Sequence, residues 1–213
     1  AWYPLYARDL PWRHTQEPYR IWLSEIMLQQ TRVEAVKNYY ARFLETFPDI
    51  AALAAAEQDQ VNKCWEGLGY YSRAANLRKA AQTIQEQYGG VFPRTWEEVR
   101  GLAGVGDYTA GAVCSICYGL PTPAVDGNVL RVAARVMNHF CEIDRPEQKA
   151  AVTALLRQVY LDNPEHCGTL TQAFMEIGAT VCVPNGQPHC ETCPLSELCL
   201  GLSLIHISEP TRR

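Results

Sequence analysis

Apolar residues recur at helical spacing along most of this chain, whereas the alternation typical of a strand is nearly absent. Pro18 opens a segment, predicted to be a helix over 18–30, that places Ile21, Trp22 and Leu28 on one face. The same periodicity, bounded by caps, glycines and prolines, predicts further helices over 32–46, 49–65, 72–87, 107–118, 128–140, 146–160 and 169–180. The predicted fold class is therefore all-α.

Two glycines, Gly104 and Gly106, lie between the helix at 107–118 and a short helix that begins with the capping box Thr95-x-x-Glu98. Glycines allow a sharp turn that presents consecutive backbone N–H groups, and such groups beside a helix N-terminus can hold a phosphate. A plain interhelical turn is the simpler interpretation of the tripeptide alone. Its place between two helices favours a helix-hairpin-helix element.

Four cysteines near the end of the chain, Cys182, Cys190, Cys193 and Cys199, are separated by seven, two and five residues. A segment this short cannot build an apolar core and needs a cross-link. Four thiolates in one irregular loop suit a [4Fe–4S] cluster. Zinc is the alternative, although a zinc site of four cysteines usually shows two C-x-x-C pairs and this loop has one. Disulfides or free thiols are the third interpretation.

Composition narrows the class of protein. The chain has 213 residues, of which 47% are hydrophobic and 20% charged, an ordinary globular balance. The other five cysteines lie among apolar residues, so we expect small buried side chains rather than bridges. No signal peptide or membrane-spanning run is visible, and a reducing cytoplasm fits best. The net charge of −4 argues against nonspecific coating of nucleic acid, but not against a local basic strip.

Both ends of the chain have unusual features. The sequence starts at Ala1, without Met, inside a predicted helix, so we expect that it is truncated at the front. The tail over 202–213 follows no earlier pattern and resembles a translated cloning remnant, so we treat 201–213 as a non-native tail.

Taken in order, these motifs resemble the endonuclease III superfamily of helix-hairpin-helix DNA glycosylases. The hairpin is followed by Val125-Asp-Gly-Asn-Val129 and then by the four-cysteine loop. Ser24-Glu-Ile-Met-Leu-Gln-Gln-Thr31 and Gly67-Leu-Gly-Tyr-Tyr-Ser-Arg73 are similar to the adenine DNA glycosylase branch. Two departures are visible: one extra residue between the first two cluster cysteines, and no C-terminal domain of the kind that helps the family read 8-oxoguanine.

The resemblance assigns catalysis to two carboxyl groups. Glu25 shares a helix face with apolar residues, so its pKa should lie above the usual range, as general-acid work on adenine requires. Asp126 would stabilise the oxocarbenium-like sugar left when the base departs. Asn128 would orient Asp126 or a water molecule, although either residue could instead simply cap the helix that follows.

Tyr108 distinguishes two reaction types. It follows the hairpin where bifunctional relatives carry a lysine, whose amine forms a Schiff base and cuts the DNA backbone. A phenol cannot do so, and we therefore expect base removal without a lyase step.

The resemblance also assigns contacts to DNA. Base removal from a duplex requires extrusion of the nucleotide, and Tyr70 would fill the gap as a flat wedge. The contacts expected with the orphaned guanine or 8-oxoguanine come from Gln30, Thr31, Leu68 and Tyr70. Those at the adenine pocket come from Trp12 and Arg13. Arg73 is an expected phosphate contact or part of a solvated helix face.

The sequence therefore predicts a monofunctional glycosylase that removes adenine opposite 8-oxoguanine or guanine in double-stranded DNA. Two helical lobes are expected to flank a cleft, one from 13–118 and one from 1–12 with 119–200, which holds the cluster. We expect a monomer in the cytoplasm of a bacterial cell, associated with the nucleoid and not with a membrane. Alternatives are a glycosylase for thymine opposite guanine, a bifunctional lyase, and a noncatalytic DNA-binding module with an iron–sulfur cluster.

Overall fold

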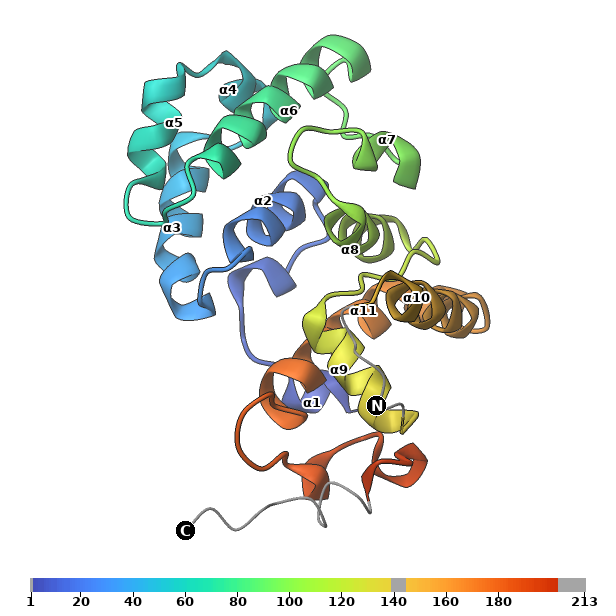
Figure 1. The fold of residues 1–213 in the computed structure, drawn as a ribbon. Helices are drawn as coiled ribbons and strands as arrows, with labels where there is room; N and C mark the ends of the chain where they lie inside the picture. Colours follow the sequence, from blue (N-terminus) through green and yellow to red (C-terminus); the bar gives the residue numbers. More distant parts are fainter. Residues whose placement is uncertain (1, 139–144, 203–213) are drawn as a thin grey trace.

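The computed structural model describes residues 2–138 and 145–202, and within them all regular structure is helical (Figure 1). The all-α prediction is confirmed. Eleven α-helices are formed by the described residues: α1 Tyr3–Tyr6, α2 Pro18–Leu28, α3 Val33–Thr46, α4 Ile50–Ala55, α5 Gln58–Trp65, α6 Ser72–Tyr88, α7 Trp96–Arg100, α8 Asp107–Tyr118, α9 Gly127–Val136, α10 Pro146–Leu161 and α11 Cys167–Glu176.

Local sequence signals explain most helix boundaries. Pro18 is the first residue of α2, and the Glu17 carboxylate accepts hydrogen bonds from the backbone N–H groups of the second and third residues, Tyr19 and Arg20. The predicted capping box is present, because the Thr95 side chain accepts from the backbone of Glu98 and the Glu98 side chain accepts from the backbone of Thr95. The α6 helix ends at Gly89, whose φ of 62° is left-handed.

One helix prediction is wrong. The segment 49–65 is not a single helix but two, because the chain extends at Ala56 (ψ 148°) before α5 begins. A capping box between Glu57 and Gln60 starts the second helix. Neither glycine nor proline marks this break, so periodicity alone runs across it.

Two other helices end differently from the prediction. The α9 helix stops at Val136 with Met137 as its cap, so it is shorter than the predicted 128–140, whose last residues lie outside the described part. At the end of the predicted 169–180 helix, α11 gives way to one π-helical turn, Ile177–Val181. Gly178 in this turn lies against Asn128, where an added Cβ would approach the Asn128 Cβ to 2.7 Å.

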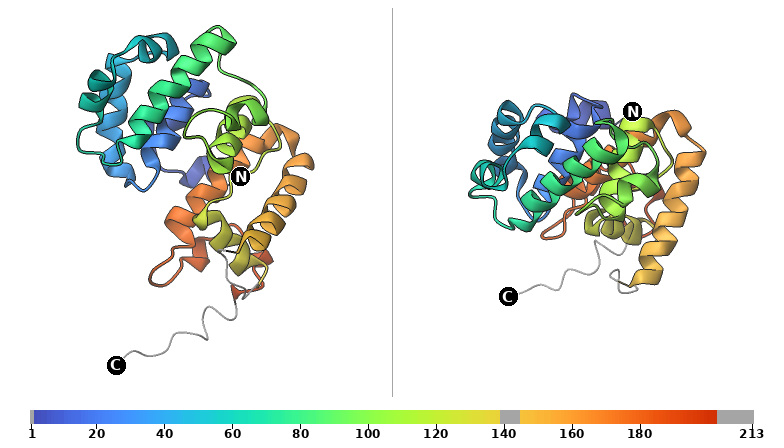
Figure 2. Two further views of the ribbon diagram at one scale, coloured as in Figure 1. Left: turned by 45° about the horizontal axis from the view of Figure 1, so that its top comes forward. Right: turned by 90° about the horizontal axis from the view of Figure 1, so that it is seen from above.

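The α2 helix lies at the centre of the main hydrophobic core. Trp22, Leu23 and Met27 are fully buried there, and α2 packs against α3, α6 and α8. The α4 and α6 helices pack against each other, and α8 also contacts α11 (Figure 2). The central position of α2 explains how a polar residue on it can be shielded from water.

Residues beyond about 124 form two smaller hydrophobic clusters. One joins α9, α10 and α11 around Tyr160, and the other packs Ile177 and Val181 against Val132 and half-buried Trp2. The main core, by contrast, runs from Leu10 to Ala124. The division into lobes at 13–118 and 119–200 stays a prediction.

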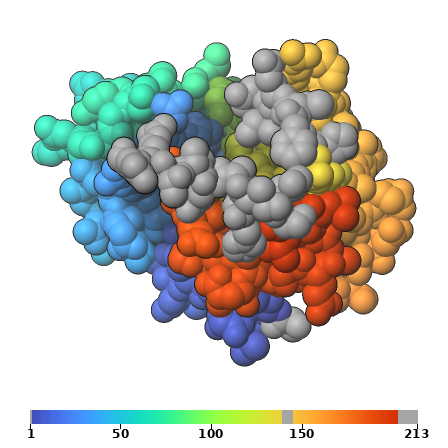
Figure 3. Space-filling view, turned by 60° about the horizontal axis from the view of Figure 1, so that its bottom comes forward, coloured from blue at the N-terminus to red at the C-terminus, as the bar shows by residue number. Residues whose placement is uncertain are grey.

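The N-terminal segment packs beside the C-terminal helices (Figure 3). Tyr3 donates a hydrogen bond to Gln172 of α11, and Arg8 forms an ion pair of 2.7 Å with Glu176 of the same helix. Most of the predicted non-native tail lies outside the described residues, as does Cys141.

None of the helices in the described ranges combines the length and the apolar character that a membrane span needs.

Candidate active site

The α2 helix carries Glu25 into a pocket of about 250 Å³ between α2, α8, α9 and α11. The Glu25 side chain is nearly buried, with 6% of the residue exposed. Ile21 and Leu28 of the same helix, one turn before and after, also line this pocket, as does Ile116 from α8. A buried helix thus holds a carboxyl group at the wall of a pocket that apolar side chains line in part.

The pKa of Glu25 is raised to about 7, chiefly by burial and to a smaller extent by the nearby charge of Asp126. The Tyr108 hydroxyl and the positive charge of Arg13 act in the opposite direction. Desolvation is the dominant cause, since a carboxylate removed from water loses more than these partners return. Glu25 can therefore carry a proton near neutral pH, as the sequence predicted.

Asp126 lines the same pocket from the N-terminus of α9. Its Oδ1 accepts a hydrogen bond of 2.8 Å from the Val129 backbone, and its Oδ2 accepts one of 2.9 Å from Asn128 Nδ2. Asp126 therefore caps α9, as one interpretation of the sequence had it, and its carboxylate also lines the pocket; its role in catalysis stays a prediction.

Asn128 is held by a further residue of α9. Its Oδ1 accepts a hydrogen bond of 2.9 Å from Arg131 Nη2, which also donates to the Gly178 carbonyl at 2.7 Å. Arg131 Nε donates to the Cys182 carbonyl at 3.0 Å. The asparagine amide is thereby oriented with its Nδ2 toward Asp126.

Tyr108 lies in the first turn of α8 and also lines the pocket. Its hydroxyl is 3.7 Å from Met175 Sδ, and burial together with the charges of Glu25 and Asp126 raises its pKa well above the usual range. The phenol therefore stays protonated. It can donate a hydrogen bond in the pocket but cannot act as a nucleophilic amine.

The predicted pocket residues Trp12 and Arg13 follow Pro11 in a short 3₁₀ turn and line the same pocket. Trp12 is buried, and its ring packs edge to face with that of Tyr40, with 5.4 Å between the two ring centroids. Arg13 Nη2 forms an ion pair of 2.5 Å with Glu176, while its buried Nη1 has no partner. Arg13 thus brings to the pocket lining a buried donor for which the described residues provide no acceptor.

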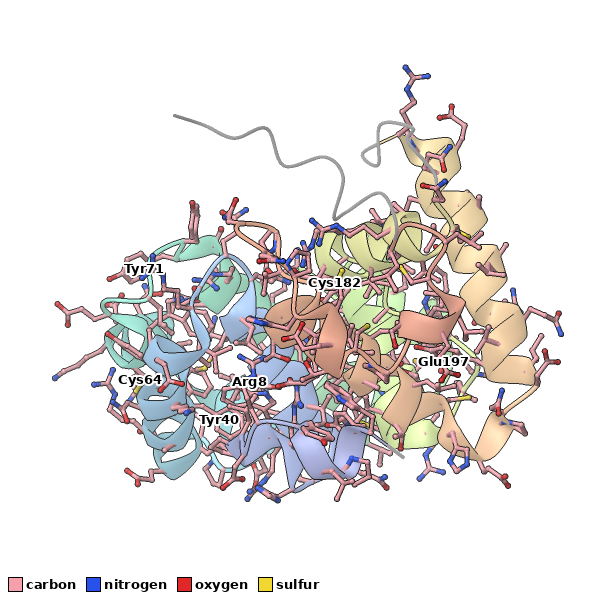
Figure 4. All side chains as sticks on the ribbon, turned by 90° about the horizontal axis from the view of Figure 1, so that it is seen from below. Arg8, Tyr40, Cys64, Tyr71, Cys182 and Glu197 are labelled. Carbon is pink, nitrogen blue, oxygen red and sulfur yellow. The ribbon has the colours of Figure 1, made fainter. Side chains whose placement is uncertain are left out.

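Sequence reasoning missed the polar residues that α11 and the N-terminal segment add to the pocket. Gln172 and Arg8 line it, and Glu176, fully buried, accepts hydrogen bonds from Arg8 and Arg13. Figure 4 shows Arg8 near the middle of the molecule. The available signal was the spacing of Gln172 and Glu176, which lie four apart, and so on one face, of a predicted helix that has no other long polar side chain.

The predicted orphan-base contacts lie on two turns next to α2 and α6. Gln30 and Tyr70 are exposed, and both have left-handed backbones, with φ of 56° and 47°. Thr31 is half-buried and lines the pocket. Leu68 is only 7% exposed and packs in the main core, so its side chain is turned away from the surface.

The suggestion that Arg73 contacts phosphate or lies on a solvated face is wrong. Arg73 is 8% exposed and its guanidinium points inward to backbone carbonyls. The amphipathic pattern of α6 gives no sign of this, because most of the acceptors belong to α2 and the turn after it, which are remote in sequence. Tyr71, next to the wedge candidate, is half-exposed and lies at the edge of the molecule (Figure 4).

The hairpin joins α7 to α8 as predicted. Gly104 and Gly106 are exposed while Val105 between them is buried, and Gly104 has a φ of 74°. The N-cap of α8, Gly106, provides no side-chain hydrogen bond, so the first N–H groups of the helix have no side-chain cap. An anion can occupy this position.

All four C-terminal cysteines, Cys182, Cys190, Cys193 and Cys199, line one apolar pocket and form no disulfide. Arg135 Nη1 lies 3.3 Å from Cys182 Sγ. Within 2–138 and 145–202, no three His, Cys, Asp or Glu side chains are grouped tightly enough to hold a metal ion. The other described cysteines form no disulfide; Cys114 and Cys167 are buried as expected, whereas Cys64 and Cys117 are only half-buried.

A helical fold with an uncapped hairpin beside a pocket of two carboxyl groups defines the class of helix-hairpin-helix repair proteins. The chain belongs to the HhH-GPD superfamily of base excision DNA repair proteins, whose sequence model matches residues 23–158.

Individual relatives agree with this assignment. The chain is 43% identical over 208 residues to the adenine DNA glycosylase of Homo sapiens. The matched region covers 93% of this chain and 38% of that relative. It therefore spans about two fifths of the length of that curated relative. Among solved structures, a thermostable thymine-DNA glycosylase is 28% identical with a TM-score of 0.84, covering 95% of this chain and 92% of that one. The protein of a non-covalent endonuclease III–DNA complex is 24% identical to this chain with a TM-score of 0.74. The match covers 90% of this chain and 86% of that one, and supports the fold.

Proposed function

We propose that this chain removes adenine paired with 8-oxoguanine or guanine in double-stranded DNA by hydrolysing the N-glycosidic bond. The similarity to an adenine DNA glycosylase over 93% of the chain supports the substrate. The observation that carries the proposal is the pocket that Glu25 and Asp126 both line. Glu25 is buried with a pKa of about 7, and the Asp126 carboxylate caps α9.

The chemistry starts with a proton. Glu25 donates its proton to N7 of the extruded adenine, which makes the base a better leaving group. The bond between N9 and C1′ then breaks, and the electron pair goes to the base. The Asp126 carboxylate stabilises the positive charge that develops on the sugar. Water adds to C1′, its proton returns to Glu25, and an abasic site remains.

Other pocket residues bind and orient the base. The unpartnered Nη1 of Arg13 offers a donor to a ring nitrogen, and Trp12 provides an apolar wall. Tyr108 adds a hydroxyl donor but no amine, so the reaction ends at the abasic site without cutting the strand. In the thymine alternative, the same carboxylates would face a different base.

DNA binding places the target base at the pocket. The backbone of Gly104 and Gly106 would hold a phosphate, a contact that positions DNA without reading its sequence. Tyr70, which is 63% exposed, would fill the space of the extruded base, with Gln30 and Thr31 beside the orphaned partner. A monomer suffices for these contacts.

The four cysteines fit a [4Fe–4S] cluster by their chemistry, because all four free thiols face one apolar pocket. Cys182, Cys190, Cys193 and Cys199 would hold it. When bound, the cluster would cross-link the loop, and no step of base removal needs its electrons. Iron analysis tests the assignment: Cys190→Ser should lose iron, whereas Cys64→Ser, a change at an unpaired cysteine outside the loop, should keep it.

A substrate panel tests the proposed function. We expect wild-type protein to release adenine from A·8-oxoguanine and A·G duplexes, and to release little thymine from T·G. Thymine release is the second candidate activity, favoured by the structural similarity to a thymine-DNA glycosylase. Tight binding to all duplexes without release of any base would instead establish a noncatalytic DNA-binding module.

The same reactions test the absence of a lyase step. Strand nicks should require alkali, and borohydride should trap no covalent complex. Nicks without alkali, together with a trapped complex, would contradict the role given to Tyr108.

A further inference from the structure

Arg73 forms an unusual connection in the described structure. It lies in the first turn of α6, three residues after Tyr70, and its guanidinium is buried. Nη1 donates hydrogen bonds to the carbonyl oxygens of Ile26 at 3.1 Å, Met27 at 2.9 Å and Gln29 at 2.7 Å. These carbonyls belong to the C-terminal end of α2, where few backbone donors remain: Gln29 N–H donates to Ile26 at 3.4 Å, and Arg73 supplies the further donors.

The other terminal nitrogen of Arg73, Nη2, binds the turn that precedes α6. Nη2 of Arg73 donates to the carbonyl oxygens of Leu68 at 3.0 Å and Gly69 at 3.2 Å, and to Thr31 Oγ1 at 3.2 Å. The guanidinium also lies over the Tyr70 ring, 5.6 Å from its centre. One side chain thus joins the turn after Leu28 to the turn before α6.

Both turns contain backbone strain. Gln30 and Tyr70 have left-handed backbones, which cost non-glycine residues free energy and persist only where neighbouring contacts fix them. These two residues are also the exposed side chains expected beside the orphaned base. The contacts of Arg73 are therefore placed where they can fix both conformations.

The contacts are specific to arginine. Within the described residues Arg73 forms no ion pair, and its charge is balanced by carbonyl dipoles, including those at the C-terminus of α2. A lysine has a single nitrogen and three donors, and cannot reach six acceptors on two separate turns. Arg42 provides a comparison: it also binds a carbonyl, that of Cys64, and lies over a tyrosine ring, but it is exposed and remote from these turns.

We propose that Arg73 is a positioning residue that locks the turns bearing Gln30 and Tyr70 to the helix bearing Glu25, so that wedge insertion and base extrusion are coupled to catalysis. The inference rests on the proposed function. It predicts that replacing Arg73 impairs extrusion more than it impairs the chemical step.

The test compares Arg73→Lys with Arg42→Lys. With 2-aminopurine at the target position opposite 8-oxoguanine, binding of wild type and Arg42→Lys should raise the fluorescence as the base unstacks. Arg73→Lys should give a clearly smaller rise at saturating protein. Its single-turnover adenine release should fall by about tenfold or more, since small misplacements of bound groups cost this much.

A second duplex separates positioning from general damage. With adenine facing a tetrahydrofuran abasic analogue, no partner base has to be displaced, and extrusion costs less. The defect of Arg73→Lys should shrink several-fold on this duplex. An equal defect on both duplexes, or fluorescence and rates equal to those of Arg42→Lys, would overturn the proposal.

Folding is monitored by circular dichroism and thermal melting. If Arg73→Lys does not fold, Arg73→Gln, which leaves no buried charge, takes its place in the same comparison. Failure of both variants to fold would overturn the proposal, since the residue would then support the whole fold. If wild type releases no adenine, the proposed function fails, while the fluorescence comparison still tests the two turns.

Discussion

Asn128 donates a hydrogen bond of 2.9 Å from its side-chain amide to Oδ2 of Asp126, two residues earlier on the same helix end. The amide is itself held by Arg131, at 2.9 Å from Asn128 Oδ1. Together these two hydrogen bonds fix the orientation of the Asp126 carboxylate at the pocket. Orientation of Asp126 therefore depends on a side chain that need not touch the substrate.

Replacing Asn128 should slow the chemistry without unfolding the protein. In Asn128→Ala, Asp126 keeps its backbone bond to Val129 but loses a hydrogen bond that holds its second oxygen. A hydrogen bond to a charged group is worth about 1.5–3 kcal/mol, so single-turnover adenine release should fall by roughly 10- to 100-fold. Asn163→Ala is the control, because Asn163 is exposed and bonds only a helix carbonyl. Equal rates for the two variants would exclude an orienting role.

Glu25 should destabilise the fold at neutral and alkaline pH. Because its pKa is raised to about 7 in the folded state, its favourable contribution is full below its unfolded pKa and is lost as pH rises through about 7. Glu25→Gln should therefore gain stability relative to wild type between pH 5 and pH 8, by at most about 3 kcal/mol. Thermal melting across this range measures the difference. Glu45→Gln, which removes an exposed carboxyl group, serves as the control.

The hairpin prediction concerns DNA affinity. In Gly104→Ala the new Cβ would lie 2.7 Å from the Asn76 Cβ, at a backbone φ of 74°, so the turn must move. Affinity for duplex DNA should fall by about tenfold, as one charge-assisted backbone contact is lost. Gly89→Ala carries the same kind of strain, with a φ of 62°, but has open space and lies at the end of α6. If both variants bind DNA equally well, the hairpin does not hold phosphate.

The ion pairs of Glu176 with Arg8 and Arg13 should stabilise the folded protein. Glu176→Gln leaves Arg8 and Arg13 without their buried carboxylate, and removal of one partner of such a pair costs about 3–5 kcal/mol. Denaturant unfolding should show this loss. The exposed pair of Glu34 and Lys37 provides the comparison, since Glu34→Gln should change stability by under about 1 kcal/mol. Similar losses in both variants would contradict a structural role for the buried cluster.

Sequence periodicity and caps were sufficient for the helical class and for most helix positions. They were also sufficient to place Glu25 on an apolar face and Asp126 at a helix start, because both features are local in sequence. The break at Ala56 escaped prediction, since its capping box begins with glutamate rather than with a residue common at that position.

Features that depend on distant segments could not be predicted. The inward turn of Arg73 depends on carbonyl groups of α2 and of Gln29 directly after it, more than 40 residues earlier in the chain, which periodicity does not describe. The burial of Leu68 likewise follows from packing in the main core. Glu176 resembles an ordinary helix glutamate until Arg8 and Arg13, from the other end of the chain, are placed beside it.

The central claim is that protonated Glu25 donates its proton to the extruded adenine. The most direct measurement is single-turnover adenine release from an A·8-oxoguanine duplex, for wild type and Glu25→Gln, as a function of pH. We predict a wild-type rate that falls as pH rises through about 7, and a loss of at least about 100-fold in the variant at pH 6 with duplex binding retained. A variant that releases adenine as fast as wild type would contradict the account.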